Sequence, residues 1–278
     1  MSVAAFGLAA GLSWGVGDFA GGLATRRIGV YAVIVVSYAV GLLLLTALAL
    51  VSAEGFPMGR DLGWAAAAGA SGALGLIALW RALAVGKMGI AAPATAVMAA
   101  AVPVVFASVT VGIPGGMQIL GLVLAFAGLW LVSRRESGGR TVHPAALRLA
   151  LIAGLGFGLY FVLIRQAAVI AVYWTLVAAR GTSLLLVVVL ALAAGGIRFP
   201  PRHLLPLVLA AGMLDVTGNV FFVIAARAGR LDVAAVLASL YPAATVVLAR
   251  MVLRERLARL QVLGIVVALI AIPLLAVP

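Results

Sequence analysis

Long apolar stretches separated by short polar gaps follow one another along the whole chain. Each ends at a glycine, a proline or a charge, and ten can be drawn: residues 4–23, 30–52, 62–84, 89–111, 116–133, 147–167, 171–194, 204–226, 231–252 and 259–277. A helix needs about 20 apolar residues to cross a bilayer. The stretches are too long and too uniformly apolar for barrel strands, and lipid cannot satisfy an open backbone. The pattern predicts an all-α polytopic membrane protein with ten transmembrane helices.

The composition agrees with this pattern. Of the 278 residues, 66% are hydrophobic and 9% are charged, whereas soluble domains have about 45–50% apolar and about 25% charged residues. The mean hydropathy is +1.29. An ordinary water-soluble protein is therefore excluded, and no sizeable extramembrane domain is expected. No basic residue precedes the first apolar stretch, unlike in a signal peptide, so we expect a retained first helix.

Basic residues are concentrated in alternate gaps. The formal net charge is +12, but the charges stand in short gaps between apolar stretches, which argues against a folded basic face for nucleic acid. Most Lys and Arg residues lie in or beside the gaps after the first, third, fifth, seventh and ninth stretches. Loops of this kind stay in the cytoplasm. The pattern predicts that these gaps, including residues 134–146, are cytoplasmic and that both termini are outside. We expect the protein to lie in a bacterial inner (plasma) membrane.

The two halves of the sequence repeat each other. An offset of 143 residues aligns Gly11 with Gly154, Gly15 with Gly158, Phe56-Pro57 with Phe199-Pro200, Gly86 with Gly229, Gln118 with Gln261, and Gly121 with Gly264. Matches at one offset across a whole half indicate duplication. We expect a first five-helix repeat at residues 1–133, a linker at 134–146 and a second repeat at 147–278. Because five is odd, the second copy enters the membrane from the opposite side, an arrangement typical of secondary transporters.

Several short motifs occur in a fixed order along the chain. They are Gly11-Leu-Ser-Trp-Gly15 with its counterpart Gly154-Leu-Gly-Phe-Gly158, Ala-Ala-Arg180-Gly, Leu237-Ala-Ser-Leu-Tyr-Pro242, and Arg254-Glu255-Arg256-Leu257 followed by Gln261 and Gly264. On these residues the chain resembles EamA-type transporters of the drug/metabolite transporter (DMT) superfamily over essentially its whole length. The resemblance implies export or exchange of small metabolites, such as amino acids, nucleotide sugars, organic cations or sugar phosphates, through a central cavity between the repeats.

Two features depart from the pattern of that family. The first half lacks an arginine in its second helix and an acidic residue before its fifth, where it has Val111-Gly-Ile-Pro-Gly-Gly-Met117 instead. Family members are also usually drawn with cytoplasmic termini, whereas the charges of this chain predict termini outside.

Charged residues deep in the apolar stretches are the strongest candidates for chemistry. Asp18, Arg180 and Asp215 lie well inside their stretches, and Arg81 lies about one turn from the end of the third. Each charge at the bilayer midplane costs about 2.5–3.5 kcal/mol unless it is paired or hydrated. Two interpretations remain open. Arg180 and Asp215 could form a pair that fastens the seventh helix to the eighth, or these groups could line a water-filled cavity and meet the substrate.

Polar and aromatic residues at helical spacing extend this set. Asn219 follows Asp215 by four residues and shares its helix face. Trp14 and Trp80 could face a cavity or anchor the protein at the membrane interface. The predicted substrate-binding residues are Trp14, Asp18, Trp80, Arg81, Tyr160, Arg180, Asp215, Asn219 and Tyr241. Pro93, Pro103 and Pro242 are candidate gating hinges, because a proline removes a backbone hydrogen bond from a helix.

The resulting functional hypothesis is a secondary transporter that takes amino acids or similar zwitterions. Arg180 would receive a carboxylate, Asp18 or Asp215 an ammonium group, and protons could be the coupling ion. The main alternative is an organic-cation or multidrug exporter; a lipid-carrier flippase and a membrane-embedded transferase are remoter ones. No enzymatic activity, metal or cofactor is expected. Cysteine is absent, the histidines have no acidic partners at helical spacing, and the single lysine, Lys87, lacks a P-loop pattern.

Overall fold

The computed structural model describes residues 3–110, 112, 115–133, 144–197, 199–228, 231–254 and 259–275. Every regular element in these ranges is a helix, so the all-α prediction is confirmed for them. The elements are α1 (Val3–Ile28), α2 (Val30–Val51), α3 (Arg60–Val85), α4 (Met88–Thr110), α5 (Gly116–Ser133), α6 (Pro144–Ala167), α7 (Tyr173–Ala193), the 3₁₀ helix η1 (Arg202–Leu204), α8 (Leu205–Ala228), α9 (Leu231–Ala238), α10 (Tyr241–Val252) and α11 (Arg259–Leu275).

Six of the helical segments are long and apolar enough to cross a membrane. They are α2, α3, α4, α6, α7 and the segment formed by η1 with α8. Shorter apolar helices occur at 119–128, 241–252 and 262–271. Helices satisfy their own backbone groups, which lipid cannot do. The chain is thus a polytopic membrane protein.

The ninth predicted stretch, 231–252, is divided in the structure. The prediction of one continuous helix was wrong here, because α9 ends at Ala238 and α10 begins at Tyr241. Pro242 stands in the first turn of α10, where its missing N–H costs nothing. Pro93 and Pro103, by contrast, lie inside the continuous helix α4. The predicted linker, 134–146, is outside the described residues up to position 143, and α6 begins at Pro144.

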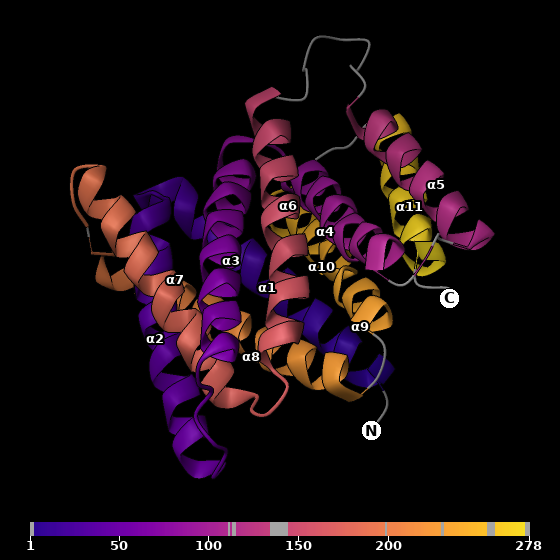
Figure 1. Cartoon of the computed structure of the whole chain (residues 1–278). Helices are drawn as coiled ribbons and strands as arrows, with labels where there is room; N and C mark the ends of the chain where they lie inside the picture. Colours follow the sequence, from indigo (N-terminus) through magenta and orange to yellow (C-terminus); the bar gives the residue numbers. More distant parts are fainter. Residues whose placement is uncertain are drawn as a thin grey trace.

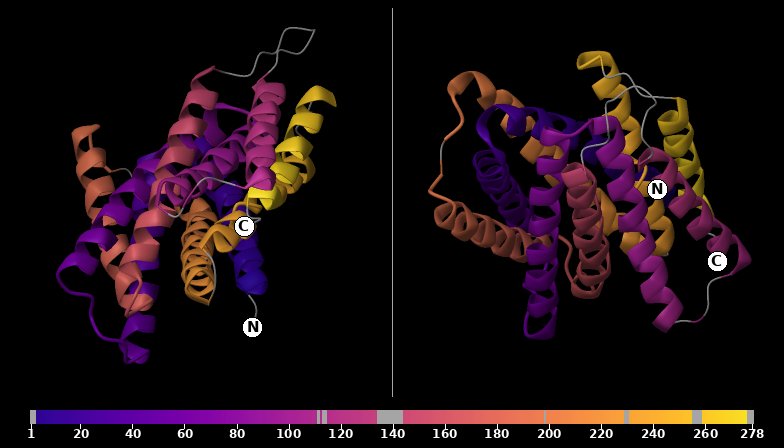
Figure 2. Two further views of the ribbon diagram at one scale, coloured as in Figure 1. Left: turned by 45° about the vertical axis from the view of Figure 1, so that its right-hand side comes forward. Right: turned by 90° about the horizontal axis from the view of Figure 1, so that it is seen from above.

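The helices before and after residue 140 pack against each other in pairs. α3 lies along α6 and α1 along α8, while α2 contacts α7, α4 contacts α10, and α5 lies along α11. The pair of α2 and α7 lies at one side of the bundle and the pair of α5 and α11 at the other (Figures 1 and 2). In chain order, α1 to α5 correspond to α6, α7, α8, α9 with α10, and α11. When each helix in these pairs is replaced by its counterpart, the same set of pairs results.

Two close helix contacts repeat at the offset seen in the sequence. A Cβ atom on Gly75 of α3 would lie 2.9 Å from the ring of Phe157 on α6. A Cβ atom on Gly218 of α8 would lie 2.5 Å from the ring of Trp14 on α1. Gly218 stands 143 positions after Gly75, and Phe157 stands 143 positions after Trp14. In both places the absence of a side chain lets an aromatic ring approach the neighbouring helix closely.

Candidate functional site

A pocket that is partly open to solvent lies between the helices, with about 630 Å³ of empty space including its open part. Helices α1, α2, α3, α6, α7, α8 and α10 all contribute to its wall, so both parts of the chain form it. The residues that line it are Trp14, Asp18, Tyr38, Gly72, Leu76, Phe157, Tyr160, Phe161, Leu176, Ala179, Arg180, Ser183, Asp215, Asn219 and Tyr241.

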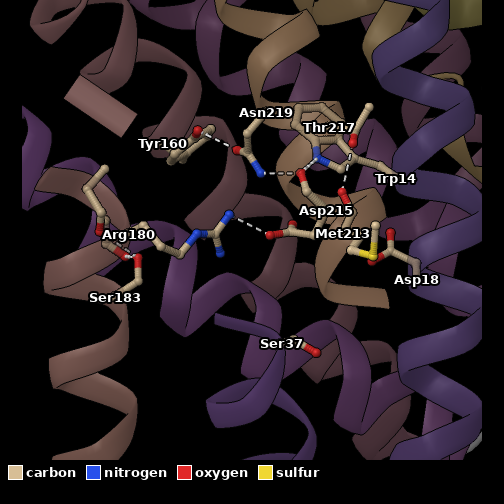
Figure 3. Close-up of polar contacts among 12 residues, drawn as sticks. Trp14, Asp18, Ser37, Tyr160, Arg180, Ser183, Met213, Asp215, Thr217 and Asn219 are labelled. Atoms are coloured by element: carbon tan, nitrogen blue, oxygen red, sulfur yellow. Dashed lines mark hydrogen bonds and ion pairs between the residues drawn. The ribbon is translucent and has the colours of Figure 1, made fainter. Parts of the chain in front are cut away.

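Arg180 and Asp215 form an ion pair in this wall. The Nη2 atom of Arg180 lies 2.5 Å from Oδ2 of Asp215, which joins α7 to α8 (Figure 3). The guanidinium carbon also lies 4.2 Å from the ring centroid of Tyr38 on α2. Arginine cannot lose its proton in a protein. The carboxylate and the ring face together compensate the charge of this buried side chain.

A chain of hydrogen bonds continues from Asp215 along α8. The Tyr160 hydroxyl donates to Oδ1 of Asn219, and Nδ2 of Asn219 donates to the backbone oxygen of Asp215 at 2.6 Å (Figure 3). The indole Nε1 of Trp14 donates to the same backbone oxygen at 3.2 Å. The four-residue spacing of Asp215 and Asn219 places both on one helix face. These bonds fix the orientation of the polar groups at the cavity.

Asp18 is the second carboxylate of the cavity, and its partners are different. It is buried on α1 and accepts a hydrogen bond from Nε1 of Trp80, 3.0 Å away. Among the described residues no basic side chain pairs with Asp18. Since Arg180 and Asp215 compensate each other, Asp18 is the one charge that the described wall leaves without an opposite charge.

Seven of the nine predicted substrate-binding residues line this one cavity: Trp14, Asp18, Tyr160, Arg180, Asp215, Asn219 and Tyr241. Trp80 stands behind the wall. It is 1% exposed and holds Asp18, so its interpretation as an interfacial anchor was wrong. Arg81 lies outside the cavity, because its side chain is exposed and its guanidinium carbon is 5.1 Å from the ring centroid of Tyr31.

Several wall residues were missed by the sequence analysis. Ser183 follows Arg180 by three residues, so helical spacing would have indicated it; its hydroxyl donates to the backbone oxygen of Gly69 at 2.7 Å. Tyr38 stands in an apolar stretch, and only its ring contact with the guanidinium of Arg180 gives it a role. Phe157 and Phe161 stand among apolar residues in the same way.

The wall is suited to binding an organic solute rather than a metal ion. Aromatic rings from α1, α2, α6 and α10 surround the three charged groups. Nowhere in the described ranges do three or more His, Cys, Asp or Glu residues gather as metal ligands. An aromatic wall with few, well-placed polar groups is the usual form of a small-molecule site.

Comparison with known proteins matches one family to the second part of the chain. The EamA-like transporter family matches residues 145–277. No curated protein sequence matches the chain. One solved structure, titled only "Crystal structure of protein", is similar with a TM-score of 0.70 and 14% sequence identity, covering 98% of this chain and 95% of the other. At this identity the likeness shows the fold alone.

Proposed function

We propose that the whole chain is a secondary active transporter, an exporter or exchanger, of a small metabolite. The match of residues 145–277 to the EamA-like transporter family supports this. The observation that carries the proposal is the central cavity, which brings together Asp18, Arg180 and Asp215 from both parts of the chain. Three deep charges on three separate helices would be a large cost to insertion. Their convergence on one cavity is the arrangement expected of a substrate pathway.

The architecture that we propose is two inverted five-helix repeats, which gives ten membrane spans. α9 and α10 then form one interrupted span, in the place that α4 has in the first repeat. The helix pairs that survive exchange of the two parts support this. So do the matched contacts of Gly75 with Phe157 and of Gly218 with Trp14. Rocking of two such units around a site near the midplane gives alternating access.

The substrate class that we propose is amino acids or similar zwitterions. Arg180 would bind the carboxylate, because a guanidinium presents paired donors to a planar anion. Asp18 would bind the ammonium group, since it has no cationic partner among the described residues. In this proposal the substrate carboxylate displaces Asp215 from Arg180. The ion pair is therefore the resting arrangement, and both earlier interpretations of Arg180 apply in different states.

Asp18 is also the group that we propose to carry a coupling proton. It is buried, it lines the cavity, and the neutral indole of Trp80 is its hydrogen-bond donor. A carboxylate in this setting gains a partner either by binding a cation or by taking up a proton. Competition between these two events would couple solute movement to a proton gradient.

An organic-cation exporter is the second candidate, and one observation favours it. The charge of Arg180 is already compensated by Asp215 and by the Tyr38 ring. What remains for a ligand is one carboxylate, Asp18, surrounded by aromatic rings, which is a suitable environment for a cation. A cation would leave the Arg180–Asp215 pair intact, whereas a zwitterion would open it.

Counterflow in proteoliposomes distinguishes these candidates. We expect neutral amino acids to exchange in vesicles with the wild-type protein, and Arg180→Ala to abolish this exchange. The matched control is Arg60→Ala, because Arg60 stacks on Trp64 at the start of α3. Exchange of cations that survives Arg180→Ala would establish the second candidate. Exchange of neither class with the wild-type protein would contradict transport of both. The predicted orientation, with both termini outside, has a separate test. Tags at both termini that are accessible in intact cells would support it.

A further inference from the structure

The loop between α2 and α3 is joined to the beginning of α7. Oε2 of Glu54 accepts hydrogen bonds from the backbone N–H groups of Val172 and Tyr173, at 2.9 and 2.8 Å. The first N–H groups of a helix have no partner within that helix, and they carry the positive end of its dipole. A carboxylate that accepts two of them forms a charge-assisted contact. Glu54 thus connects the first half of the chain to the second.

A ring contact strengthens the same junction. The centroids of Phe56 and Trp174 lie 5.3 Å apart, with an edge-to-face angle of 63°. Phe56 follows Glu54 by two residues in the loop, and Trp174 follows Tyr173 in the first turn of α7. The loop is therefore held by both a polar and an aromatic contact.

The Glu54 contact lies on the helix that carries Arg180. Leu176 and Arg180 both line the cavity, and Arg180 is seven residues, or about 10 Å of helix, beyond Tyr173. α2, which leads into the loop of Glu54, carries Tyr38 opposite Arg180. The same two helices are thus joined at the cavity by Tyr38 and Arg180, and at the N-terminus of α7 by Glu54.

The opposite end of the cavity has no equivalent contact. At the offset of 143 residues, Ile197 stands in the place of Glu54, and the N-terminus of α2 stands in the place of that of α7. α2 begins after Gly29, which has no side chain to cap it. No side-chain acceptor within the described ranges bonds to the first N–H groups of α2. The contact of Glu54 with the N-terminus of α7 therefore has no counterpart at the N-terminus of α2.

We propose that Glu54 is a gating residue, which holds the cavity closed on the side of the α2–α3 loop. This inference rests on the proposed transport function, since alternating access requires α2 and α7 to separate on that side. Separation breaks both hydrogen bonds of Glu54. Because the other end has Ile197 instead, the contact shifts the resting population toward the state that is closed at the α2–α3 loop.

The chain contains no cysteine, so a single introduced thiol reports on access without further changes. Leu176→Cys places that thiol in the cavity wall, one turn into α7. A membrane-impermeant maleimide is added to oriented vesicles from the side of the α2–α3 loop, and the modification rate is measured. We expect Glu54→Ala to raise this rate about tenfold, the size of effect given by a hydrogen bond to a charged group. Glu54→Gln keeps an acceptor but not the charge, and we expect a smaller increase.

Two controls separate gating from loss of structure. Asp61→Ala removes a carboxylate from the first turn of α3, and we expect it to leave the modification rate at Leu176→Cys unchanged. A thiol at Val169, which is 58% exposed, reacts equally fast with and without Glu54. The proposal would be overturned if the thiol of Leu176→Cys reacted at the same rate with Glu54, Ala or Gln at position 54. It would also be overturned if Glu54→Ala raised the rates at Val169→Cys and Leu176→Cys by the same factor.

The readout also separates this proposal from the transport function. The thiol measurement needs no substrate. A rate that responds to Glu54 in a protein without counterflow supports the gating contact and contradicts transport of the zwitterions and cations tested. A protein with counterflow whose Leu176→Cys rate ignores Glu54 keeps the transport function and loses the gating residue.

Discussion

Trp80 holds Asp18 from behind the cavity wall. Its indole nitrogen lies 3.0 Å from the Asp18 carboxylate, and its ring lies against α1 at Gly21, where a Cβ atom would collide with it. An indole is a donor only. Trp80 therefore fixes the position of the carboxylate and leaves the other oxygen for a proton or a cation.

The first prediction concerns this hydrogen bond. Trp80→Phe keeps an aromatic ring but removes the donor, which leaves a buried carboxylate without a partner. An unsatisfied buried group costs about 1–3 kcal/mol, or more if charged. We expect a lower melting temperature in detergent and a reduced response of transport to an imposed pH gradient. Trp64→Phe is the control, because Trp64 stacks on Arg60 away from the cavity. Equal effects of both substitutions would contradict a specific role for Trp80.

The second prediction concerns the ion pair of Arg180 and Asp215. Asp215→Ala leaves a buried arginine that cannot lose its charge, and removal of one partner of a buried pair costs about 3–5 kcal/mol. Removal of both partners costs less than the sum of the single changes. We expect Asp215→Ala to destabilise the protein more than Arg180→Ala with Asp215→Ala together. A double-mutant cycle on thermal unfolding measures the difference, and additive effects would show that the pair is not coupled.

The third prediction tests the repeated glycine contacts. Gly75→Ala and Gly218→Ala each place a methyl group against an aromatic ring, and overpacking of this kind costs about 1–3 kcal/mol. We expect the two substitutions to lower the melting temperature by similar amounts. Gly181→Ala, which meets no atom within 4 Å, is the control; alanine is the better helix former by about 1 kcal/mol, so stability stays equal or rises. A large effect at only one of Gly75 and Gly218 would argue against equivalent halves.

The sequence predicts the helices well because the bilayer imposes a strong constraint. Nearly all predicted apolar stretches fall on observed helices, since only a long apolar segment satisfies both its side chains and its backbone in lipid. The interruption at Ser239 and Leu240 was missed. Hydropathy does not change there, and Pro242 alone does not distinguish a kinked helix from the beginning of a new one.

Whether a cavity residue was predicted depends on how rare its residue type is in a membrane-spanning segment. Asp18, Arg180 and Asp215 were predicted because a charge in an apolar stretch requires a reason. Tyr38 was missed, since a tyrosine in such a stretch is ordinary and its contact with Arg180 depends on how α2 packs against α7. Arg81 was included because it is a charge in an apolar stretch. It lies near the end of its helix, where the sequence does not say whether a side chain faces the interior or the surface.

The fourth prediction separates the ring of Tyr38 from its hydroxyl. Tyr38→Phe keeps the aromatic face under the Arg180 guanidinium, whereas Tyr38→Leu removes it. A buried cation–π contact contributes about 2 kcal/mol, so we expect Tyr38→Leu to raise the KM for a zwitterionic substrate more than tenfold and Tyr38→Phe to change it little. Tyr31→Leu is the control, because Tyr31 makes the same kind of contact with Arg81 outside the cavity. Counterflow at graded substrate concentrations measures the three values. If Tyr38→Leu and Tyr31→Leu gave the same KM, Tyr38 would not be the residue that positions Arg180 for the substrate.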